Sequence, residues 1–187
     1  MTKEDEQIID MYWAREQEAI TETADKYGKY CGTIAWNILY NSEDCEECLN
    51  DTWLKAWNSM PTERPQILSA FLGAITRNLS LDRYRKNHAK KRGEGQVAYI
   101  FEELQDCFSS TGPEEELDAK ELVNALNDFL RKLDGDNRKI FVRRYWYMDS
   151  VEAIAERFQV SAGKVKSSLF RTRNKLRLFL QERGFTV

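Results

Sequence analysis

The side chains that most often carry catalysis or bind metals are few and scattered in this sequence. His88 is the only histidine among 187 residues, and its neighbours Asn87 and Lys90 favour a solvent-facing or phosphate-facing imidazole over a catalyst. Cys45 and Cys48 form a single C-x-x-C pair, whereas a structural zinc ion takes four ligands, usually from paired motifs. The acidic residues are concentrated in a helix start and one long acidic stretch, and no Gly-rich phosphate loop accompanies them. The sequence therefore argues against an enzyme such as a nuclease, and we expect no cofactor and no metal site.

The four cysteines are Cys31, Cys45, Cys48 and Cys107. We expect them to be thiols, since cysteines in a reducing compartment remain unpaired. Cys45 and Cys48 are three residues apart beside Leu49, so both fall on one face of a helix. Buried small hydrophobic side chains are the favoured interpretation, and a metal or redox role is the alternative.

Charge is divided into blocks, although the formal net charge is only −3. Residues 1–60 have a net charge of −8, and residues 93–121 also have −8. Residues 71–92 and 161–187 each have a net charge of +6. Two separate basic patches on an acidic protein indicate two contacts with one polyanion, whereas solvated helix faces are the simpler alternative.

The segment from Asp149 to Val165 has the pattern of a helix-turn-helix. Asp149, with Glu152 three residues later, is expected to form a capping box at the start of the first helix. Val160 is expected to fill the turn, and Ser161 to cap the second helix. A helix-turn-helix is typical of DNA binding, and a helical pair that only packs is the alternative.

The second helix of this pair has two different faces. Its apolar stripe consists of Val165, Leu169, Thr172, Leu176, Phe179 and Leu180. Phe170 lies outside that stripe among basic and hydroxyl residues, which fits a helix that enters the major groove and contacts a thymine methyl group. The candidate DNA-contacting residues are Lys164, Lys166, Ser167, Phe170, Arg171 and Asn174.

The whole chain is expected to be α-helical. Hydrophobic residues make up 42% and charged residues 32%, the mean hydropathy is −0.65, and no segment has the pattern of a strand. Apolar periodicity predicts helices near residues 8–12, 19–39, 42–60, 66–89, 117–133 and 137–146, before the pair in 149–180. The predicted fold class is all-α, with two small helical domains, 1–92 and 117–187, joined by an acidic linker, 93–116, part of which is expected to dock.

The sequence also predicts the N-cap of one helix in the first domain and the outward face of another. Ser42 is the expected N-cap of helix 42–60. In helix 66–89, Ser80 and Tyr84 are expected to project with Arg77 away from the apolar stripe. Asp82 falls on the extension of that stripe, so we expect it to be buried and paired with a nearby arginine.

Three segments resemble one family. Residues 42–57 are similar to an acidic helix that ends in alternating aromatics, residues 71–85 to a promoter-melting helix, and residues 163–176 to an upstream-element reader. These motifs occur in the order and spacing of bacterial sigma factors of the extracytoplasmic-function (ECF) type, in the sigma-70 superfamily. The resemblance covers about residues 8–92 and 120–183.

The resemblance implies an alternative sigma factor that binds core RNA polymerase, reads the −35 and −10 elements of promoter DNA and helps to melt it. The outward face of residues 164–174 would read the −35 element. A loop from Pro61 to Gln66 would capture a flipped base, and helix 71–92 would hold the strand. The residues implied for the −10 element are Arg64, Gln66, Arg77, Asn78, Arg85 and Lys86. The residues implied for the polymerase contact are Asp44, Glu47, Asn50 and Asp51, while Leu49, Trp53 and Trp57 hold the core.

Further expectations concern partners and location. The acidic linker would thread into the basic interior of the polymerase, and an anti-sigma factor is a further partner that the sequence leaves open. No apolar run approaches the ~20 residues that span a bilayer, and the acidic N-terminus lacks a secretion signal, so we expect no membrane insertion and a cytoplasmic location. The alternative function is a one-component helix-turn-helix transcriptional regulator, which would bind duplex DNA without polymerase.

Overall fold

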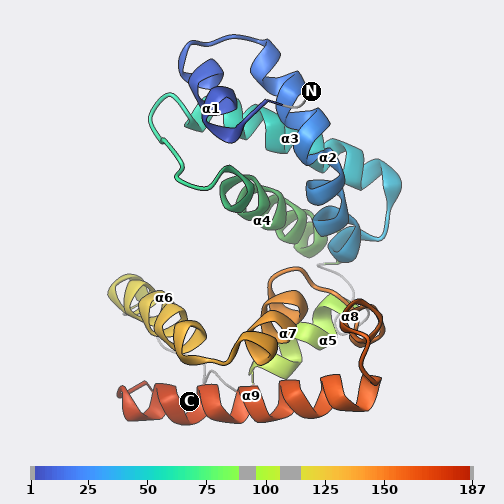
Figure 1. Cartoon of the computed structure of the whole chain (residues 1–187), viewed down its shortest axis with the longest axis vertical. Coiled ribbons are helices and arrows are strands. Elements are labelled where there is room, and N and C mark those ends of the chain that lie inside the picture. Colours follow the sequence, from blue (N-terminus) through green and yellow to red (C-terminus); the bar gives the residue numbers. More distant parts are fainter. Residues whose placement is uncertain (1–2, 89–95, 106–114, 186–187) are drawn as a thin grey trace. The chain divides into compact units, whose positions relative to one another are not determined.

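The structure is a computed structural model that describes residues 3–88, 96–105 and 115–185 (Figure 1). All regular secondary structure in these residues is α-helical, which confirms the predicted fold class. The chain divides into two compact units, Met1–Arg92 and Gly93–Val187, each of which is described by itself.

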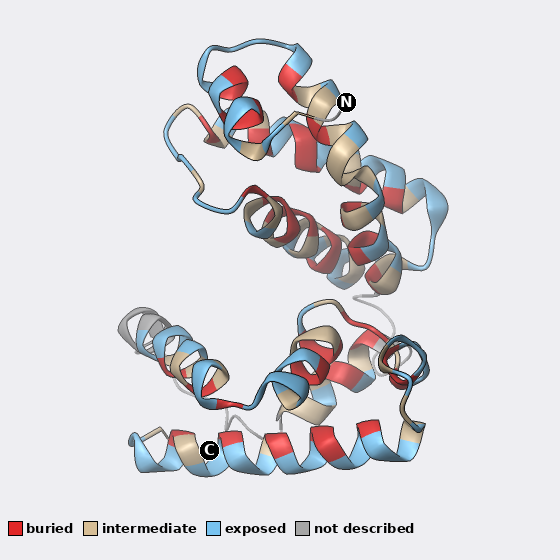
Figure 2. Ribbon diagram, viewed as in Figure 1, coloured by how far each residue is buried: buried red, intermediate tan, exposed pale blue. Residues whose placement is uncertain are grey.

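The first unit consists of α1 (Asp5–Trp13), α2 (Glu18–Leu39), α3 (Ser42–Ser59) and α4 (Leu68–His88). Helices α2, α3 and α4 pack against one another, and α1 packs on α2. Their buried residues face inward along each helix, as the red positions in Figure 2 show. Fully buried core side chains include Tyr12, Ile34, Ile38, Met60, Leu68 and Leu72.

The start of α3 differs from the prediction by one residue. Asn41, not Ser42, is the N-cap, and its side chain accepts a hydrogen bond from the Asp44 backbone N–H at 2.9 Å. Ser42 is the first residue of the helix. Both residue types cap helices, so local sequence did not discriminate between them.

The polar residues of α4 contradict two predictions. Ser80 was expected to face outward, but it is fully buried. Its hydroxyl donates to the Thr76 carbonyl at 2.8 Å and lies 3.1 Å from the Cys48 sulfur on α3, so the buried hydroxyl is hydrogen-bonded. Asp82 is exposed and pairs with Arg85 one turn along the helix, so its predicted pairing is right and its predicted burial is wrong. Short hydroxyl side chains that bond to the carbonyl four residues earlier can be buried at low cost. The α3–α4 contact is therefore lined partly by hydroxyls and a thiol, and the apolar pattern alone did not locate it.

The second unit consists of α5 (Gln96–Gln105), α6 (Glu115–Lys132), α7 (Gly135–Tyr145), α8 (Val151–Phe158) and α9 (Ala162–Glu182). Helix α9 packs against α6, α7 and α8. Helix α6 ends at Lys132, before the predicted Asp134–Gly135 break, and Asp134 then caps α7 by accepting from the Asn137 N–H.

Helix α5 lies within the predicted linker. Val97 and Ile100 are buried in the second unit, whereas Tyr99 and Glu102 are exposed, so α5 is amphipathic and docked. The acidic composition of residues 93–116 concealed this short periodic segment. The prediction that part of the linker docks is confirmed, and the docked part is a helix.

The predicted capping box of the helix-turn-helix is wrong at its first residue. Ser150 is the N-cap of α8 and accepts from the Ala153 N–H at 3.0 Å. Asp149 is buried and paired with Arg143, with its Oδ2 2.6 Å from Nε. Ser161 caps α9 as predicted, accepting from the Lys164 N–H at 3.2 Å.

Candidate nucleic-acid interface

The outward face of α9 is fixed by the burial of its opposite side. The left-handed conformation of Gln159, at φ 52°, ends α8 and turns the chain so that α9 packs across it. Five of the six predicted stripe residues of α9 are buried, and Phe179 is half-buried. The opposite side therefore faces solvent, and Phe170 is 58% exposed on it. We call the following exposed residues the reading face: Lys164, Lys166, Ser167, Phe170, Arg171 and Asn174.

The cations of the reading face are not neutralised within the protein. Among the described residues, Lys164, Lys166 and Arg171 form no ion pair. Arg173 differs, because its Nη1 donates to the Tyr145 hydroxyl at 2.7 Å and lies 3.5 Å from a Glu103 oxygen. The reading face thus combines exposed positive charge with an exposed aromatic ring, a combination that suits phosphates and base edges.

Ser168 on α9 points inward. It is buried, and its hydroxyl is within hydrogen-bond reach of the Asn137 side-chain oxygen on α7. This contact helps to set the rotation of α9, so the side chains of the reading face point away from α7.

The loop before α4 is tied to α1. Arg64 donates to Asp10 Oδ1 at 2.5 Å, and its guanidinium lies 5.9 Å from the centre of the Trp13 ring. Gln66 is exposed in the same loop. Arg64 therefore contacts α1 in this structure, and Trp13, which is half exposed, is an aromatic neighbour of the loop that the sequence did not indicate.

The α4 residues implied for DNA contact are placed unequally. Asn78 and Lys86 are exposed, whereas Arg85 is exposed and paired with Asp82 at 3.3 Å. Arg77 is half-buried, and burial, together with the positive charge of Arg85, lowers the pKa of its guanidinium. These four residues share one helix with Arg83, whose role is different.

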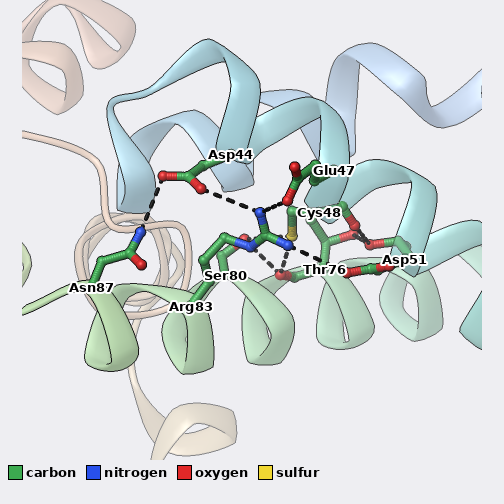
Figure 3. A network of polar contacts seen from close by, with 9 residues as sticks. Asp44, Glu47, Cys48, Asp51, Thr76, Ser80, Arg83 and Asn87 are labelled. Carbon is green, nitrogen blue, oxygen red and sulfur yellow. Dashed lines mark hydrogen bonds and ion pairs between the residues drawn. The ribbon is translucent and has the colours of Figure 1, made fainter.

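Arg83 of α4 is inserted into a row of carboxylates on α3 (Figure 3). Its Nη1 lies 3.2 Å from Asp44 Oδ1 and contacts Glu47, and its Nη2 lies 3.6 Å from Asp51 Oδ2. Asn87, one turn farther along α4, donates to Asp44 Oδ2 at 3.1 Å. The hydrogen bond that Arg83 donates to the Glu47 carboxylate raises the pKa of Arg83 above its usual value despite partial burial. We call Asp44, Glu47 and Asp51 the acidic row.

The acidic row contains three of the four residues implied for the polymerase contact. Glu47 and Asp51 keep 69% and 54% of their side chains exposed, and Asn50 between them is exposed as well. Sequence reasoning missed Arg83 as the residue that organises them. A signal was present, because acids spaced by three and four residues form one line on a helix, which a long cation of a neighbouring helix can meet.

Three thiols lie in the first unit. Cys31, Cys45 and Cys48 are free thiols, as predicted, and Cys45 and Cys48 are buried, as predicted; Cys31 is buried as well, and Cys107 lies outside the described residues. Burial raises the pKa of all three thiols, that of Cys31 to about 11, so they are protonated at neutral pH. The described part of the chain contains no group of histidine, cysteine or acidic side chains that could hold a metal ion. No helix in the described residues is long and apolar enough to cross a membrane.

Comparison with known proteins gives matches in both units. The family model for Sigma-70 region 2 matches residues 25–90, and that for Sigma-70, region 4 matches residues 124–176. The ECF RNA polymerase sigma factor SigW of Bacillus subtilis (strain 168) is 24% identical over 171 residues, which cover 89% of this chain and 91% of SigW. A solved structure, "Structure of CnrH in complex with the cytosolic domain of CnrY", shares 20% identity with a TM-score of 0.44 and covers 95% of this chain and 97% of that one.

Proposed function

The chain belongs to the sigma-70 family as an alternative sigma factor of the ECF type, which directs promoter-specific transcription initiation by core RNA polymerase, and we propose how its two units divide that work. The second unit reads the −35 element through the reading face of α9. The first unit binds the polymerase through α3 and holds the −10 element through α4 and the preceding loop. A one-component regulator would leave the region 2 match in the first unit without a purpose.

The exposed aromatic ring within unpaired positive charge is the observation that supports −35 reading most directly. Phe170 exposes more than half of its surface, although nearby apolar positions on α9 are buried. Lys166 and Arg171 flank it without an ion pair among the described residues. In a major groove, Phe170 contacts a thymine methyl group, while the cations bind phosphates or guanine edges.

The contact with the −10 element is a strand-holding contact. Asn78, Arg85 and Lys86 present donors along α4, and Gln66 is exposed in the preceding loop. Unstacking a base costs a few kcal/mol, which a cationic surface and a base pocket offset. Arg64 leaves Asp10 when it binds a phosphate, an exchange of one exposed ion pair for another. Arg77 supports the same strand from a half-buried position.

The polymerase contact uses the acidic row and Asn50. Arg83 already holds the three carboxylates in one line, so little side-chain entropy is lost when a basic polymerase surface binds them. Glu47, Asn50 and Asp51 form the exposed part of this contact. The activity is binding, with no catalytic step assigned to this chain, and it takes place in the cytoplasm with the polymerase. An anti-sigma factor that covers these same surfaces is the natural form of control.

Reconstituted transcription tests the division of work. Phe170→Ala and Arg171→Ala should each lower the binding free energy for the −35 element by about 1–3 kcal/mol, because each removes a base or phosphate contact. The rate of −35-dependent initiation should fall accordingly. Affinity for core polymerase should stay unchanged, since the second unit's reading face is not part of the α3 contact. Initiation rates on promoters with intact and scrambled −35 elements measure the first quantity, and a core-binding titration the second.

A matched control is Arg131→Ala on α6. Arg131 also belongs to the second unit, is highly exposed and pairs with Asp128 in its own helix, so its removal changes net charge equally. It should leave −35 discrimination intact. Equal losses for Arg131→Ala and Arg171→Ala, or a loss of core binding with Phe170→Ala, would contradict the assignment of the reading face.

A further inference from the structure

The end of α1 and the loop before α4 meet in one exposed corner of the first unit. Arg64 of the loop donates to Asp10 Oδ1 at 2.5 Å, and its guanidinium lies 5.9 Å from the centre of the Trp13 ring. Asp10 and Trp13 are three residues apart, so they project from the same face of α1. Trp13 keeps 45% of its surface exposed, and Asp10 and Arg64 are exposed as well. A planar cation, a carboxylate and an indole therefore share one surface beside the loop.

Contacts with α3 hold this corner in place. Tyr12 of α1 is fully buried, and its ring centre lies 6.0 Å from that of Trp57 on α3. Arg15 has a left-handed φ of 59°, which is uncommon for a residue with a long side chain. Its guanidinium lies 4.1 Å from the centre of the Trp57 ring, and its Nη1 donates to the Trp57 carbonyl at 2.7 Å. The end of α1 is thus fastened to the end of α3, so Asp10 and Trp13 have fixed positions beside the loop that leaves α3 (Figure 1).

The contacts of Arg64 indicate what else this corner can bind. A guanidinium is a planar group that donates N–H bonds and stacks on aromatic rings. A base with an amino group is also planar, donates N–H bonds from its edge and stacks on aromatic side chains. Arg64 therefore makes, within the protein, the two contacts that such a base can make with Asp10 and Trp13.

We propose that Asp10 and Trp13 form a base site on the α1 side of the loop, where the captured base stacks on Trp13 and donates from its amino group to Asp10. This site rests on the −10 role proposed above, and it adds two residues and a class of base to that role. Arg64 moves from Asp10 to a phosphate of the captured strand, which uncovers the face of the indole. Adenine, cytosine and guanine have an amino group, whereas thymine presents one N–H between two carbonyl oxygens, which repel a carboxylate. The base site therefore selects against thymine.

The balance of charges and hydrogen bonds favours this exchange. Without Arg64, Asp10 is an unpaired carboxylate beside a DNA strand, and an unpaired carboxylate repels phosphates. A hydrogen bond from the base amino group gives Asp10 a new partner while Arg64 binds the phosphate. Stacking on Trp13 offsets part of the cost of unstacking the base from its neighbours in the strand.

The first test locates the base that lies on Trp13. Holoenzyme assembled from this chain and core polymerase binds promoter probes with a pre-melted −10 element, in which 2-aminopurine replaces one non-template base at a time. 2-Aminopurine has an amino group, and an indole stacked on it quenches its fluorescence. Trp13→Ala should raise the fluorescence about twofold or more at one position. Trp36→Ala is the matched control, because Trp36 on α2 is a similarly exposed tryptophan, and it should leave every position unchanged.

The second test measures the affinity of the holoenzyme for probes with each of the four natural bases at that position. Trp13→Ala should weaken the binding of every probe about tenfold, because it removes the stacking surface, and Trp13→Phe should restore most of this loss. The wild-type holoenzyme should bind adenine, cytosine and guanine about fivefold more tightly than thymine. Asp10→Asn should abolish this preference, since an amide both donates and accepts and so pairs with thymine as well.

Glu6→Gln is the matched control for Asp10→Asn, since it also converts an exposed carboxylate of α1 into an amide. It should keep the preference against thymine, because a change in net charge affects all four probes alike. An unchanged preference in Asp10→Asn, or wild-type fluorescence and affinity in Trp13→Ala, would overturn the base site.

Failure of the base site and failure of the proposed −10 role give different results. The −10 role fails if Asn78→Ala and Lys86→Ala on α4 leave the affinity for the pre-melted probes unchanged. The base site alone fails if these two variants weaken binding while Trp13→Ala and Asp10→Asn behave like the wild type.

Discussion

The α3–α4 contact of the first unit and the reading face of the second are built from the same charged residue types, but their charges are used in opposite ways. On α4, Arg83 is surrounded by the acidic row and has become part of the helix packing. On α9, Lys166 and Arg171 face solvent without an ion pair among the described residues. A basic block in the sequence therefore marks either a contact within the protein or an exposed cationic surface, and the neighbouring helix decides which.

The difference follows from what each helix packs against. Helix α4 lies against α3, whose acids recur every three or four residues along one line. Helix α9 packs its apolar stripe on α6, α7 and α8, and its cations lie opposite that stripe. Arg173 is the exception on α9, because Glu103 and Tyr145 lie within its reach. Whether a cation forms an ion pair within the protein thus depends on the acids of the helix packed next to it, and not on the composition of its own segment.

The largest expected effect on this comparison comes from Arg83→Ala. Removing the guanidinium leaves three neighbouring carboxylates to repel one another, so the free energy of unfolding of the first unit should fall by about 2 kcal/mol. Denaturant unfolding followed by tryptophan fluorescence measures this, since four of the five tryptophans are in the first unit. Arg171→Ala, which removes the same positive charge from an exposed position, should leave the same unfolding transition unchanged. A stability loss of equal size in both variants would remove the distinction between packed and exposed cations.

A smaller effect is expected from Asp51→Lys. The new ammonium group repels Arg83 and a basic polymerase surface, so affinity for core polymerase should fall about tenfold, or roughly 1.4 kcal/mol, without global unfolding. A binding titration with core polymerase gives the affinity, and circular dichroism confirms the fold. Glu46→Lys, exposed on α3 outside the acidic row, is the control for net charge. The acidic row is excluded from the polymerase contact if both reversals have the same effect.

The smallest effect concerns the start of α9. Ser161→Ala removes the N-cap of the helix that bears the reading face, which should cost about 1 kcal/mol in the stability of the second unit. Ser167→Ala, in the middle of the same helix, should cost less, because alanine favours the helix and this side chain makes no cap. Hydrogen exchange of the α9 amides compares the two variants. A greater loss of protection in Ser167→Ala would show that the cap does not stabilise α9.

Much of the fold could be predicted because helix-forming periodicity is local. The stripe that begins at Val165 located the buried side of α9, and with it the exposed position of Phe170. The predictions that were wrong concern polar groups near helix ends and contacts. Asp149 was expected to cap α8 and is instead buried with Arg143, and Ser80 was expected to face outward and is instead buried beside Cys48. A carboxylate or hydroxyl can satisfy either role, and only its spatial neighbours select one.

The sequence by itself determined most of the helices, the two faces of α9, the burial of Cys45 and Cys48 and the separation of charge into blocks, because side-chain spacing along one helix fixes which residues share a face. The tertiary structure alone decided that Arg83 is enclosed by the acidic row, that Arg64 contacts α1, and that Glu103 fastens α5 beside the reading face. These contacts join residues 36, 54 and 41 positions apart, and no periodicity within a single helix carries information about the helix that will lie against it.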